Sequence, residues 1–512
     1  MRKNISRIKV FSMMISLVLV SSLYGQHRGD LFTFQGLTTM NDNGVQAMAM
    51  GSAVTSLSGD VSMLFYNPAG LANIKGIQAT ASVNVSNSSW QENQNYRPNR
   101  LFVHLPFYLE GLYTPDPAQD GMYDYERLWT EEYLIDSSYI VRPPELGLDP
   151  YSDEAADWKE TERSFSFNNI AIAIPLDFSG HEFTISGAYN NILNIDDFDR
   201  NETYLDPHVG FDAYGEIGRT NGNDTLIMNW SNFYRKSSGK MDNVALGISY
   251  KVSKIINVGV GMNLSWGSSD DLIYLERIGT FHLIRQQRFR YWYTDVYDEI
   301  KGTSNYSTTR FNLGFQLDLE KFKVGIKVDL PYTLKKEWDY TFTETDSISN
   351  NVSSSKGTDQ FEVPYIYNFG FSYAPADNFI FSVDYEYAPY SKATMEFGAA
   401  DSAYNPITDR HTDLPDRHTI RIGALYTPIE LISIMAGYRD TPSTYIPDGA
   451  AIQTSGPTSK SYTCGLSFNT DYGRLDLAYE YRLLKYYDSY YSNTNYNTNT
   501  YTNFMVGYTI EL

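Results

Sequence analysis

Histidine and acidic residues gather between positions 409 and 418, where their side chains could bind a metal ion. His411 and His418 lie close in sequence to Asp409, Asp413 and Asp416. Imidazole and carboxylate groups are common ligands of divalent metals. The same residues flank the start of an alternating segment, where charged side chains are commonly solvated. The solvated junction is the favoured interpretation, so no metal site is predicted.

Motifs for catalysis are missing from the sequence. It contains no Gly-x-Ser-x-Gly elbow, no phosphate-binding glycine loop and no His-Glu-x-x-His pair. The seven histidines are scattered, and the single cysteine, Cys464, excludes both an intrachain disulfide and a cysteine-based zinc site. The sequence therefore predicts a protein that is not an enzyme, with no catalytic residues and no cofactor.

The acidic balance of the chain limits its partners. The formal net charge is −21 at pH 7, which disfavours binding to nucleic acid. Fourteen acidic residues, against three basic ones, fall between positions 116 and 162. Such a run is usually a solvated loop. Its spacing matches no known calcium loop, although calcium binding there stays open as the alternative.

Residues 1–25 have the features of a secretory signal peptide. Four basic residues lie among the first nine, positions 10–20 are mostly apolar, and small residues precede position 26. No run of about 18 apolar residues follows, so no transmembrane helix is predicted. We expect an exported chain that is cleaved after Gly25. A non-cleaved anchor helix is the less favoured alternative, because the apolar run is short for spanning a membrane.

Apolar residues alternate with polar or small residues through most of the remaining chain. Between Ile256 and Trp266, for example, every second residue is apolar. A period of two indicates a β-strand with one apolar face. Most of these segments have the roughly 9–11 residues that a tilted strand needs to cross a bilayer. Fourteen segments show the pattern: 77–87, 165–175, 182–191, 242–252, 256–266, 307–319, 322–332, 361–374, 378–388, 417–427, 431–439, 461–469, 473–483 and 501–511.

The lengths of the connections indicate how these strands are arranged. Long and short connections alternate along the chain, as a membrane barrel requires, with short periplasmic turns at one end and long external loops at the other. We therefore predict an all-β fold, a fourteen-stranded antiparallel transmembrane β-barrel over residues 77–512. A soluble β-sandwich is the less favoured alternative. The short connections are 176–181, 253–255, 320–321, 375–377, 428–430 and 470–472. The long connections, predicted to be external loops, are 88–164, 192–241, 267–306, 333–360, 389–416, 440–460 and 484–500.

Charged residues of both signs lie on the polar phase of the predicted strands. In lipid each would cost a few kcal/mol near mid-depth, so we expect them to face the lumen. Pairing that holds the wall together is the favoured role, and direct contact with a passing solute is the alternative. The set comprises Lys251, Asp318, Lys323, Lys327, Asp329, Asp384, Glu386, Arg421, Arg439, Arg474, Asp476, Glu480, Arg482 and Glu511.

The stretch before the first predicted strand has a different character. Small and apolar residues from Met48 to Leu57 fit one face of a short helix. The sequence Asn67-Pro68-Ala69-Gly70 follows, and it predicts a compact turn because Pro68 has a fixed φ and Asn67 can bond nearby backbone. We predict that residues 26–76 form a small, partly helical hatch inside the barrel, whose lumen has room for a plug.

This stretch resembles the N-terminal hatch of the outer-membrane long-chain fatty acid transporter family (OMPP1/FadL/TodX). Members carry a Gly/Ala-rich helical segment, an acidic residue and Asn-Pro-Ala before the first strand. Here these are residues 47–54 (AMAMGSAV), Asp60 and Asn67-Pro68-Ala69. The predicted strand number also matches that family. One departure is the final residue, Leu512, which stands where the family has an aromatic assembly signal.

The resemblance implies passive uptake of long-chain fatty acids or similar hydrophobic compounds across the outer membrane of a Gram-negative-type bacterium. Outer-membrane lipid would surround the barrel. External loops would capture the solute, and a shift of the hatch or a gap in the wall would release it. Glycine inside a strand often marks a bend. Gly187, with Asn190 and Asn191 after it in segment 182–191, is therefore the predicted wall kink.

The same hatch pattern occurs in the shuttle barrel of type nine secretion (PorV), which leaves a second function open. Such a protein would bind protein partners through its external loops. An apolar lumen pocket would favour the transporter, and an open groove beneath the loops would favour the shuttle. A general porin is disfavoured because an open pore needs no plug. A phospholipase would need Ser and His on neighbouring strands at the lipid boundary, and nothing in the sequence indicates them.

Overall fold

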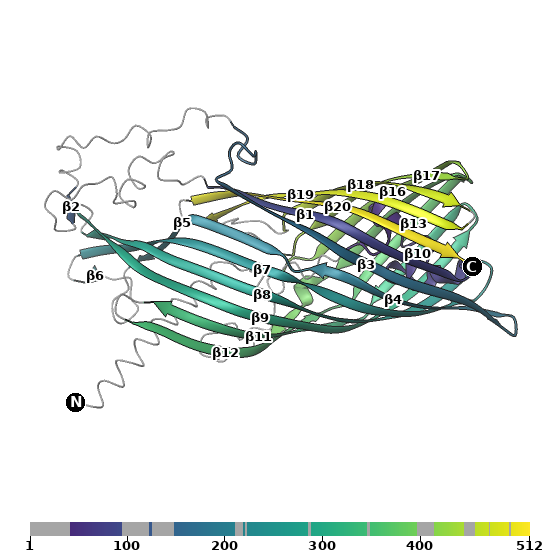
Figure 1. Ribbon diagram of the computed structural model, residues 1–512, viewed down its shortest axis with the longest axis horizontal. Coiled ribbons are helices and arrows are strands. Elements are labelled where there is room, and N and C mark those ends of the chain that lie inside the picture. The colour runs from purple at the N-terminus through teal and green to yellow at the C-terminus, as the bar shows by residue number, and fades with distance from the viewer. Residues whose placement is uncertain are drawn as a thin grey trace.

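A computed structural model of the chain shows an elongated antiparallel β-barrel that encloses a small N-terminal hatch (Figure 1). The predicted signal peptide and residues 26–40 of the predicted hatch lie outside the described residues, as does most of the acidic stretch 116–162. The structure describes residues 41–94, 122–124, 148–209, 219–220, 223–284, 288–345, 349–396, 414–444, 456–470, 472–490 and 493–512.

Fourteen antiparallel strands form the closed barrel wall in the described part of the chain. Each strand pairs with the next along the chain, and β1 pairs with both β3 and β20, which closes the cylinder. The wall strands are β1 (Gln78–Gln94), β3 (Trp158–Phe178), β4 (His181–Asn194), β7 (Asn223–Lys251), β8 (Ile256–Ile284), β9 (Arg288–Leu319), β10 (Phe322–Asp329), β13 (Ile366–Ala376), β14 (Phe379–Ala388), β16 (Arg417–Ile429), β17 (Ile432–Pro442), β18 (Thr458–Thr470), β19 (Gly473–Tyr490) and β20 (Asn493–Glu511).

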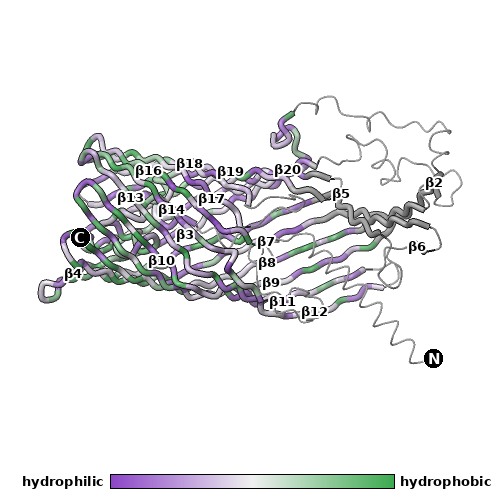
Figure 2. Tube along the Cα trace, turned by 180° about the vertical axis from the view of Figure 1, so that it is seen from behind, coloured by the Kyte–Doolittle hydropathy of each residue, from purple (hydrophilic) through white to green (hydrophobic). Residues whose placement is uncertain are grey.

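The two faces of the wall have opposite character because strand side chains alternate. On β8, Val260 and Trp266 are exposed on the outer face, while Asn257, Asn263 and Ser265 are buried toward the lumen. Hydrophobic and hydrophilic residues alternate along the barrel strands in the same way (Figure 2). An exposed apolar outer surface is what a membrane-spanning barrel presents to lipid. The predicted fold class and the predicted faces of β8 are confirmed.

Three strands extend far past their predicted segments on the side of the long connections (Figure 1). β7, β8 and β9 contain 29, 29 and 32 residues, and β5 (Asp197–Val209) pairs with the outer part of β7. The prediction of loops over 192–241 and 267–306 is therefore wrong in large part. Outside lipid no strand face must be continuously apolar, so the alternation that marks a membrane strand fades there.

The predicted loop 333–360 supplies a second part of this one-sided extension. It contains a hairpin of β11 (Tyr332–Thr345) and β12 (Asn350–Val363), and β11 pairs with the outer part of β9. Pro331 and Pro364 separate the hairpin from β10 and β13, because proline lacks the amide hydrogen that a strand interior donates. The predicted segments 322–332 and 361–374 are therefore each wrong at one end, because each contains one of these prolines.

The hatch lies inside the barrel near the rim that carries the short turns. It contains α2 (Val45–Ala49), α3 (Met63–Tyr66) and the 3₁₀ helix η1 (Pro68–Asn73). The helix expected between Met48 and Leu57 ends at Ala49, because Gly51 and Ser52 both take a φ of 62°, outside the helical region. No helix in the described ranges is long and apolar enough to cross a membrane.

Apolar side chains from the hatch and the wall form one core. Met48, Leu64 and Leu71 are almost fully buried, and they pack in a cluster with Met435 of β17 and Met505 of β20. Burial of this apolar surface stabilises the hatch inside the lumen. The hatch is therefore a folded plug that shares one apolar core with the wall.

Candidate functional site

The Asn67-Pro68-Ala69-Gly70 motif joins the hatch to the barrel wall. Asn67 is fully buried, and its side-chain oxygen accepts a hydrogen bond of 3.2 Å from the Ala69 amide, which caps helix η1. Its amide nitrogen donates to the carbonyl oxygens of Thr55 (2.7 Å) and Phe315 on β9 (3.2 Å). Pro68 occupies the first turn of the helix, where no amide hydrogen is needed. The motif thus joins two segments of the hatch, around Thr55 and Ala69, and attaches them to the wall at Phe315.

A belt of lumen-facing glycines seats the hatch against the wall. At each of these positions an added Cβ atom would lie less than 3.0 Å from a hatch atom, and at six of the nine that atom belongs to the hatch backbone, so glycine permits the close approach. On β10, for example, a Cβ at Gly325 would overlap the carbonyl group of Thr55. The glycine belt comprises nine residues, one on each of nine strands: Gly247, Gly259, Gly314, Gly325, Gly370, Gly423, Gly437, Gly465 and Gly507.

Two buried arginines bind the hatch through its carboxylates. Arg439 on β17 donates to Asp42 over 3.1 Å and also to Ser52, whose hydroxyl bonds to the same carboxylate. Arg474 on β19 pairs with Asp60, the acidic residue of the hatch pattern. Such charge-assisted bonds are stronger than neutral ones. Each hatch carboxylate therefore has a specific cationic partner on the wall.

These partners change the acidity of both hatch carboxylates. Burial by itself would raise the pKa of Asp42 and of Asp60. The guanidinium groups of Arg439 and Arg474, together with hydrogen bonds from Ser52 and Ser62, outweigh burial and lower each pKa below its ordinary value. Both groups are therefore ionised near neutral pH, as an ion pair requires.

Above the hatch the lumen opens into a cavity of about 430 Å³. Hatch residues, including Asp42, Ser52 and Tyr66, form part of its lining together with residues of the surrounding strands. Its charged lining has seven cations and five carboxylates, although the whole chain has a net charge of −21. These residues are Arg235, Arg310, Lys327, Arg417, Arg421, Arg439 and Arg482, and Asp42, Asp196, Asp197, Asp329 and Glu386.

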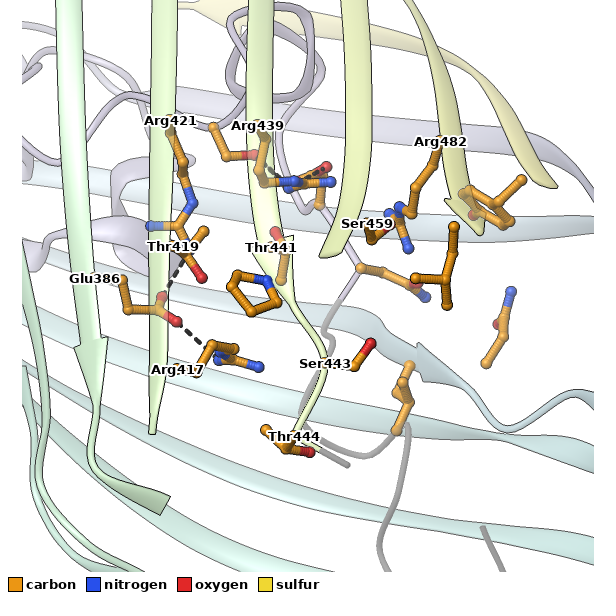
Figure 3. Close-up of a pocket in the computed structure, with 18 of the residues that line it drawn as sticks. Glu386, Arg417, Thr419, Arg421, Arg439, Thr441, Ser443, Thr444, Ser459 and Arg482 are labelled. Atoms are coloured by element: carbon orange, nitrogen blue, oxygen red, sulfur yellow. Dashed lines mark hydrogen bonds and ion pairs between the residues drawn. The ribbon is translucent and has the colours of Figure 1, made fainter. Parts of the chain in front are cut away.

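Three of the cavity arginines form a row across neighbouring strands. Arg421 and Arg439 are direct register partners on β16 and β17, and Ser461 on β18 is the register partner of both Arg439 and Arg482. We call Arg421, Arg439 and Arg482 the arginine row. Their side chains project toward the same space, along with Thr419 and Arg417 (Figure 3). The row therefore concentrates positive charge on one side of the cavity.

Carboxylates between the arginines hold this wall together. Glu386 on β14 accepts hydrogen bonds from Arg417 (2.8 Å) and Arg421 (2.6 Å). Glu480 on β19 accepts them from Arg439 (2.6 Å) and Arg482 (3.1 Å). These pairs match the favoured prediction that lumen charges brace the wall.

Other predicted lumen charges are also paired inside the barrel. Lys327 bonds to Asp329 over 2.9 Å, and Arg474 to Asp476 over 2.9 Å. Asp384, the register partner of Arg421, instead accepts the Thr55 amide of the hatch over 2.8 Å. The lumen charges thus brace the wall and also bind the hatch.

The predicted wall kink lies in β4. Gly187 is on the outer face and has regular partners on both sides, Ile172 on β3 and Leu246 on β7. Asn190 is fully buried, and its side chain donates to Asn43 of the hatch over 2.9 Å. The nearest irregularity in pairing lies just beyond, between Asn191 and Leu193. A gap in the wall at this strand stays a prediction.

The histidine and aspartate group at the start of β16 is described only in part, since residues 409–413 lie outside the described ranges. His418 Nδ1 bonds to the Tyr385 hydroxyl over 2.7 Å, and Asp416 accepts hydrogen bonds from Tyr387 and Ser391. Among the described residues, no group of three or more His, Cys, Asp or Glu is arranged to hold a metal ion.

Some residues of the site were missed by the sequence reasoning. Arg417 and Thr419 share the inward phase of Arg421 on the same strand, so alternation alone carried the signal for them. Asp42 of the hatch gave no signal, because nothing in the sequence links it to Arg439, which lies 397 positions later.

A closed fourteen-stranded barrel with an N-terminal hatch is also the fold of several solved outer-membrane channels. These structures are similar to the chain over most of its length. A FadL homologue of Pseudomonas aeruginosa is 11% identical, with a TM-score of 0.57, and the match covers 92% of this chain and 98% of that one.

Two toluene transporters have the same fold. TodX of P. putida is 11% identical with a TM-score of 0.53, and TbuX of Ralstonia pickettii is 12% identical with a TM-score of 0.51. Each match covers 92% of this chain and 99% of the other. No protein-family model and no curated protein matches the sequence. The chain therefore has the FadL/TodX channel fold, as the hatch motif predicted.

Proposed function

We propose that this protein is an outer-membrane channel for the passive uptake of long-chain fatty acids or similar hydrophobic compounds. The observation that carries the proposal is a barrel of the FadL/TodX fold whose lumen is closed by a folded hatch. A closed lumen argues against an open pore for general solutes. A solute must instead be admitted by a specific step, and the cavity above the hatch is where we expect it to bind before that step.

The cavity is not the apolar lumen pocket that would favour the transporter by itself, because its lining mixes apolar side chains such as Phe65 and Leu193 with many charged ones. This mixed lining bears on the kind of compound. A neutral hydrocarbon prefers an apolar pocket, whereas the cavity lining contains many charged side chains. An amphiphile with an ionised head suits such a lining better, and a long-chain fatty acid is a compound of this kind. The proposed solute class is therefore the fatty acid rather than the monoaromatic hydrocarbon.

Uptake of a labelled long-chain fatty acid into vesicles that contain the purified barrel tests the proposal. Wild-type vesicles should take up the label faster than empty vesicles. Asn67→Ala should change that rate, because it removes the bonds to Thr55 and Phe315 that restrain the hatch. Asn73→Ala is the matched control, since the Asn73 side chain bonds to Ser58 within the hatch and, among the described residues, to no wall residue. Equal uptake by wild-type and empty vesicles would contradict the proposal.

A second candidate function, binding of a protein partner in secretion, is favoured by one observation. β12 is paired on one side by β11, and on its other side its described pairing is limited to β15 (Thr394–Glu396) at residues 360–362. The outer part of β12 is therefore an exposed strand edge, and Val352 on it is 64% exposed. Such an edge accepts an extended segment of another protein. Shortening the hairpin over 346–356 should then impair protein export and leave fatty acid uptake unchanged.

A further inference from the structure

We propose that the outer surface of the barrel, where β13, β14 and β16 meet the long connections, binds a glycolipid of the outer leaflet whose head is a phosphorylated sugar. The site lies on the lipid-facing side of the wall, not in the lumen, and its occupancy is measured without transport. It therefore goes beyond the proposed uptake of hydrophobic compounds and stands or falls separately from it.

Five aromatic rings form a continuous row on this surface. Tyr367, Tyr387 and His418 are register partners on the three strands, so their side chains share the outer face. The ring centroids of Tyr367 and Tyr387 lie 6.5 Å apart with 15° between the planes, and those of Tyr387 and His418 lie 5.1 Å apart with 29°. We call this row of nearly parallel rings the aromatic platform. It comprises Tyr365, Tyr367, Tyr385, Tyr387 and His418.

The aromatic platform is continuous with the surface that meets lipid. Phe369 follows Tyr367 on the outer face of β13, at 45% exposure, and Ile420 follows His418 on β16, at 46%. The platform itself lies at the ends of the strands, next to the long connections, and Tyr365 directly precedes β13. It therefore lies where the apolar belt gives way to the head groups of the outer leaflet, and its partner is a lipid.

Hydrogen bonds within the protein hold these rings in place. The Tyr385 hydroxyl lies 2.7 Å from His418 Nδ1, and the Tyr387 hydroxyl donates to Asp416 over 2.9 Å. Asp416 also accepts hydrogen bonds from the Ser391 amide (3.0 Å) and the Ser391 hydroxyl (2.6 Å). Tyrosines of an ordinary interfacial belt leave their hydroxyls to water and lipid head groups. The platform is instead pre-organised, which favours a rigid partner because less freedom is lost on binding.

A sugar ring is the rigid part of a glycolipid head. The face of an aromatic ring is negative because of its quadrupole, and the C–H groups on the face of a sugar ring carry small positive charges, so the two rings stack. A glycerol-based phospholipid offers no such ring. The nearly parallel planes across three strands extend the stacking surface. The geometry therefore favours a glycolipid over a glycerophospholipid.

Two nitrogen groups beside the platform have no hydrogen-bond partner in the described part of the chain. His418 is exposed, and no described residue bonds to its Nε2. Lys392, which follows Ser391, is also exposed, and its ammonium group makes no hydrogen bond or ion pair with a described residue. The neighbouring carboxylate, Asp416, already accepts hydrogen bonds from Tyr387 and Ser391. Phosphate oxygens accept charge-assisted hydrogen bonds from such donors, so a phosphorylated head group fits here.

Native mass spectrometry of the full-length barrel, released from uncharged polyoxyethylene micelles, tests the site. The probes are diphosphoryl lipid A, the same lipid A without its phosphates, and phosphatidylglycerol as an anionic lipid without a sugar ring. We expect saturable binding of diphosphoryl lipid A, about tenfold or more tighter than binding of either other lipid. If either of the other lipids binds as tightly, the proposal is wrong, because an ordinary interfacial belt would explain the result.

Variants of the platform locate the binding. Tyr367→Leu removes one ring and breaks no hydrogen bond between described residues, so the barrel should keep the heat-modified gel mobility of a folded protein. Binding of both forms of lipid A should weaken about fivefold, the usual effect of an aromatic contact. Lys392→Gln should weaken binding of diphosphoryl lipid A about tenfold, the usual loss for a charged hydrogen bond. Binding of the dephosphorylated form should not change.

Tyr373→Leu and Lys254→Gln are the matched controls at the rim of the short turns. Tyr373 lies on the same face of β13 and stacks on Phe322 at 4.8 Å, and Lys254 is exposed in the turn between β7 and β8. Both variants should bind each lipid as wild type does.

The outcomes separate this site from the proposed function. If Tyr367→Leu and Lys392→Gln bind diphosphoryl lipid A as wild type does, the site is wrong even if uptake of fatty acid is found. If uptake fails while these two variants lose lipid A binding, the proposed function is wrong and the site stands.

Discussion

The lower and upper halves of the lumen are built from the same strands and differ in almost every other respect. In the lower half the glycine belt brings the hatch into direct contact with the wall, and apolar side chains fill the space between them. In the upper half long polar and charged side chains stand around a cavity of about 430 Å³. The lower half of the lumen holds the hatch, and the upper half contains the cavity.

This contrast shows how one wall can perform two tasks. The inward phase of β16 carries Arg417, Thr419 and Arg421 at the level of the cavity, and Gly423 at the level of the hatch. On this one strand the inward side chain thus changes from a long arginine at position 421 to none at Gly423. The same change occurs on β17 between Arg439 and Gly437. On these two strands the boundary between the hatch and the cavity therefore lies between the inward-facing arginine and the inward-facing glycine.

Removing Arg439 should damage the seal most, because this residue belongs to both halves. Arg439→Leu would leave Asp42 buried without its cation, and breaking a buried pair in this way costs about 3–5 kcal/mol. The hatch should become accessible to protease and the barrel should leak small ions in planar bilayers. Arg482→Leu is the control, since Arg482 shares Glu480 with Arg439 but has no hydrogen bond to the hatch carboxylate. Equal leak from both variants would show that the Arg439–Asp42 pair does not hold the hatch in place.

Adding one carbon to the glycine belt should have the next largest effect. Gly325→Ala places a methyl group against the Thr55 carbonyl, and overpacking of this kind costs about 1–3 kcal/mol. Ion leak should rise, while the heat-modified gel mobility that reports a folded barrel should not change. Gly187→Ala is the matched control, because its methyl would lie 3.6 Å from Leu246, an ordinary contact on the outer face. A leak in neither variant would mean that the belt does not hold the hatch.

Acid should have the smallest effect, and only at low pH. The pKa values of Asp42 and Asp60 lie below the ordinary value of 3.8 in the folded protein, because their arginine partners outweigh burial. A lowered pKa contributes stability above the unfolded value, and that stability is lost as pH falls through the folded pKa. Leak should therefore stay constant from pH 8 to about 5 and rise only below about 4. A rise between pH 7 and 5 would assign the seal to other groups.

The sequence predicted the membrane part of the wall well, because lipid imposes a strict period of two. Segment 256–266 coincides with the first part of β8, where Val258 and Val260 must meet lipid. The remaining residues of β8, up to Ile284, escaped prediction because they lie outside that constraint. The same reason explains the β11–β12 hairpin, whose polar residues were read as a loop.

The hatch was predicted from its motif, and its partners were not. Asn67 caps η1 by bonding to Ala69, and Pro68 starts the same helix, so the local sequence specifies the turn. Asp60 and Arg474 are separated by 414 positions, and only the closed barrel brings them together. The alternation predicted that six of the twelve charged cavity residues face the lumen, but not that they gather around one cavity. The reason is related. Arg421 and Arg439 become neighbours through strand register, which an alternating pattern constrains only by phase.

The glycine belt also bears on the order of assembly. The hatch comes before the first strand in the chain, yet its Val45 packs on Gly507 of the last one. The seam between β1 and β20 joins Gln78 to Glu511, nearly the full length of the described chain. Contacts of such sequence separation form late, since the loop-closure entropy must be met first. Docking of the hatch and closure of the cylinder should therefore occur together in one slow step. Before that step, with β1 and β20 unpaired, the apolar side chains of the hatch would be exposed.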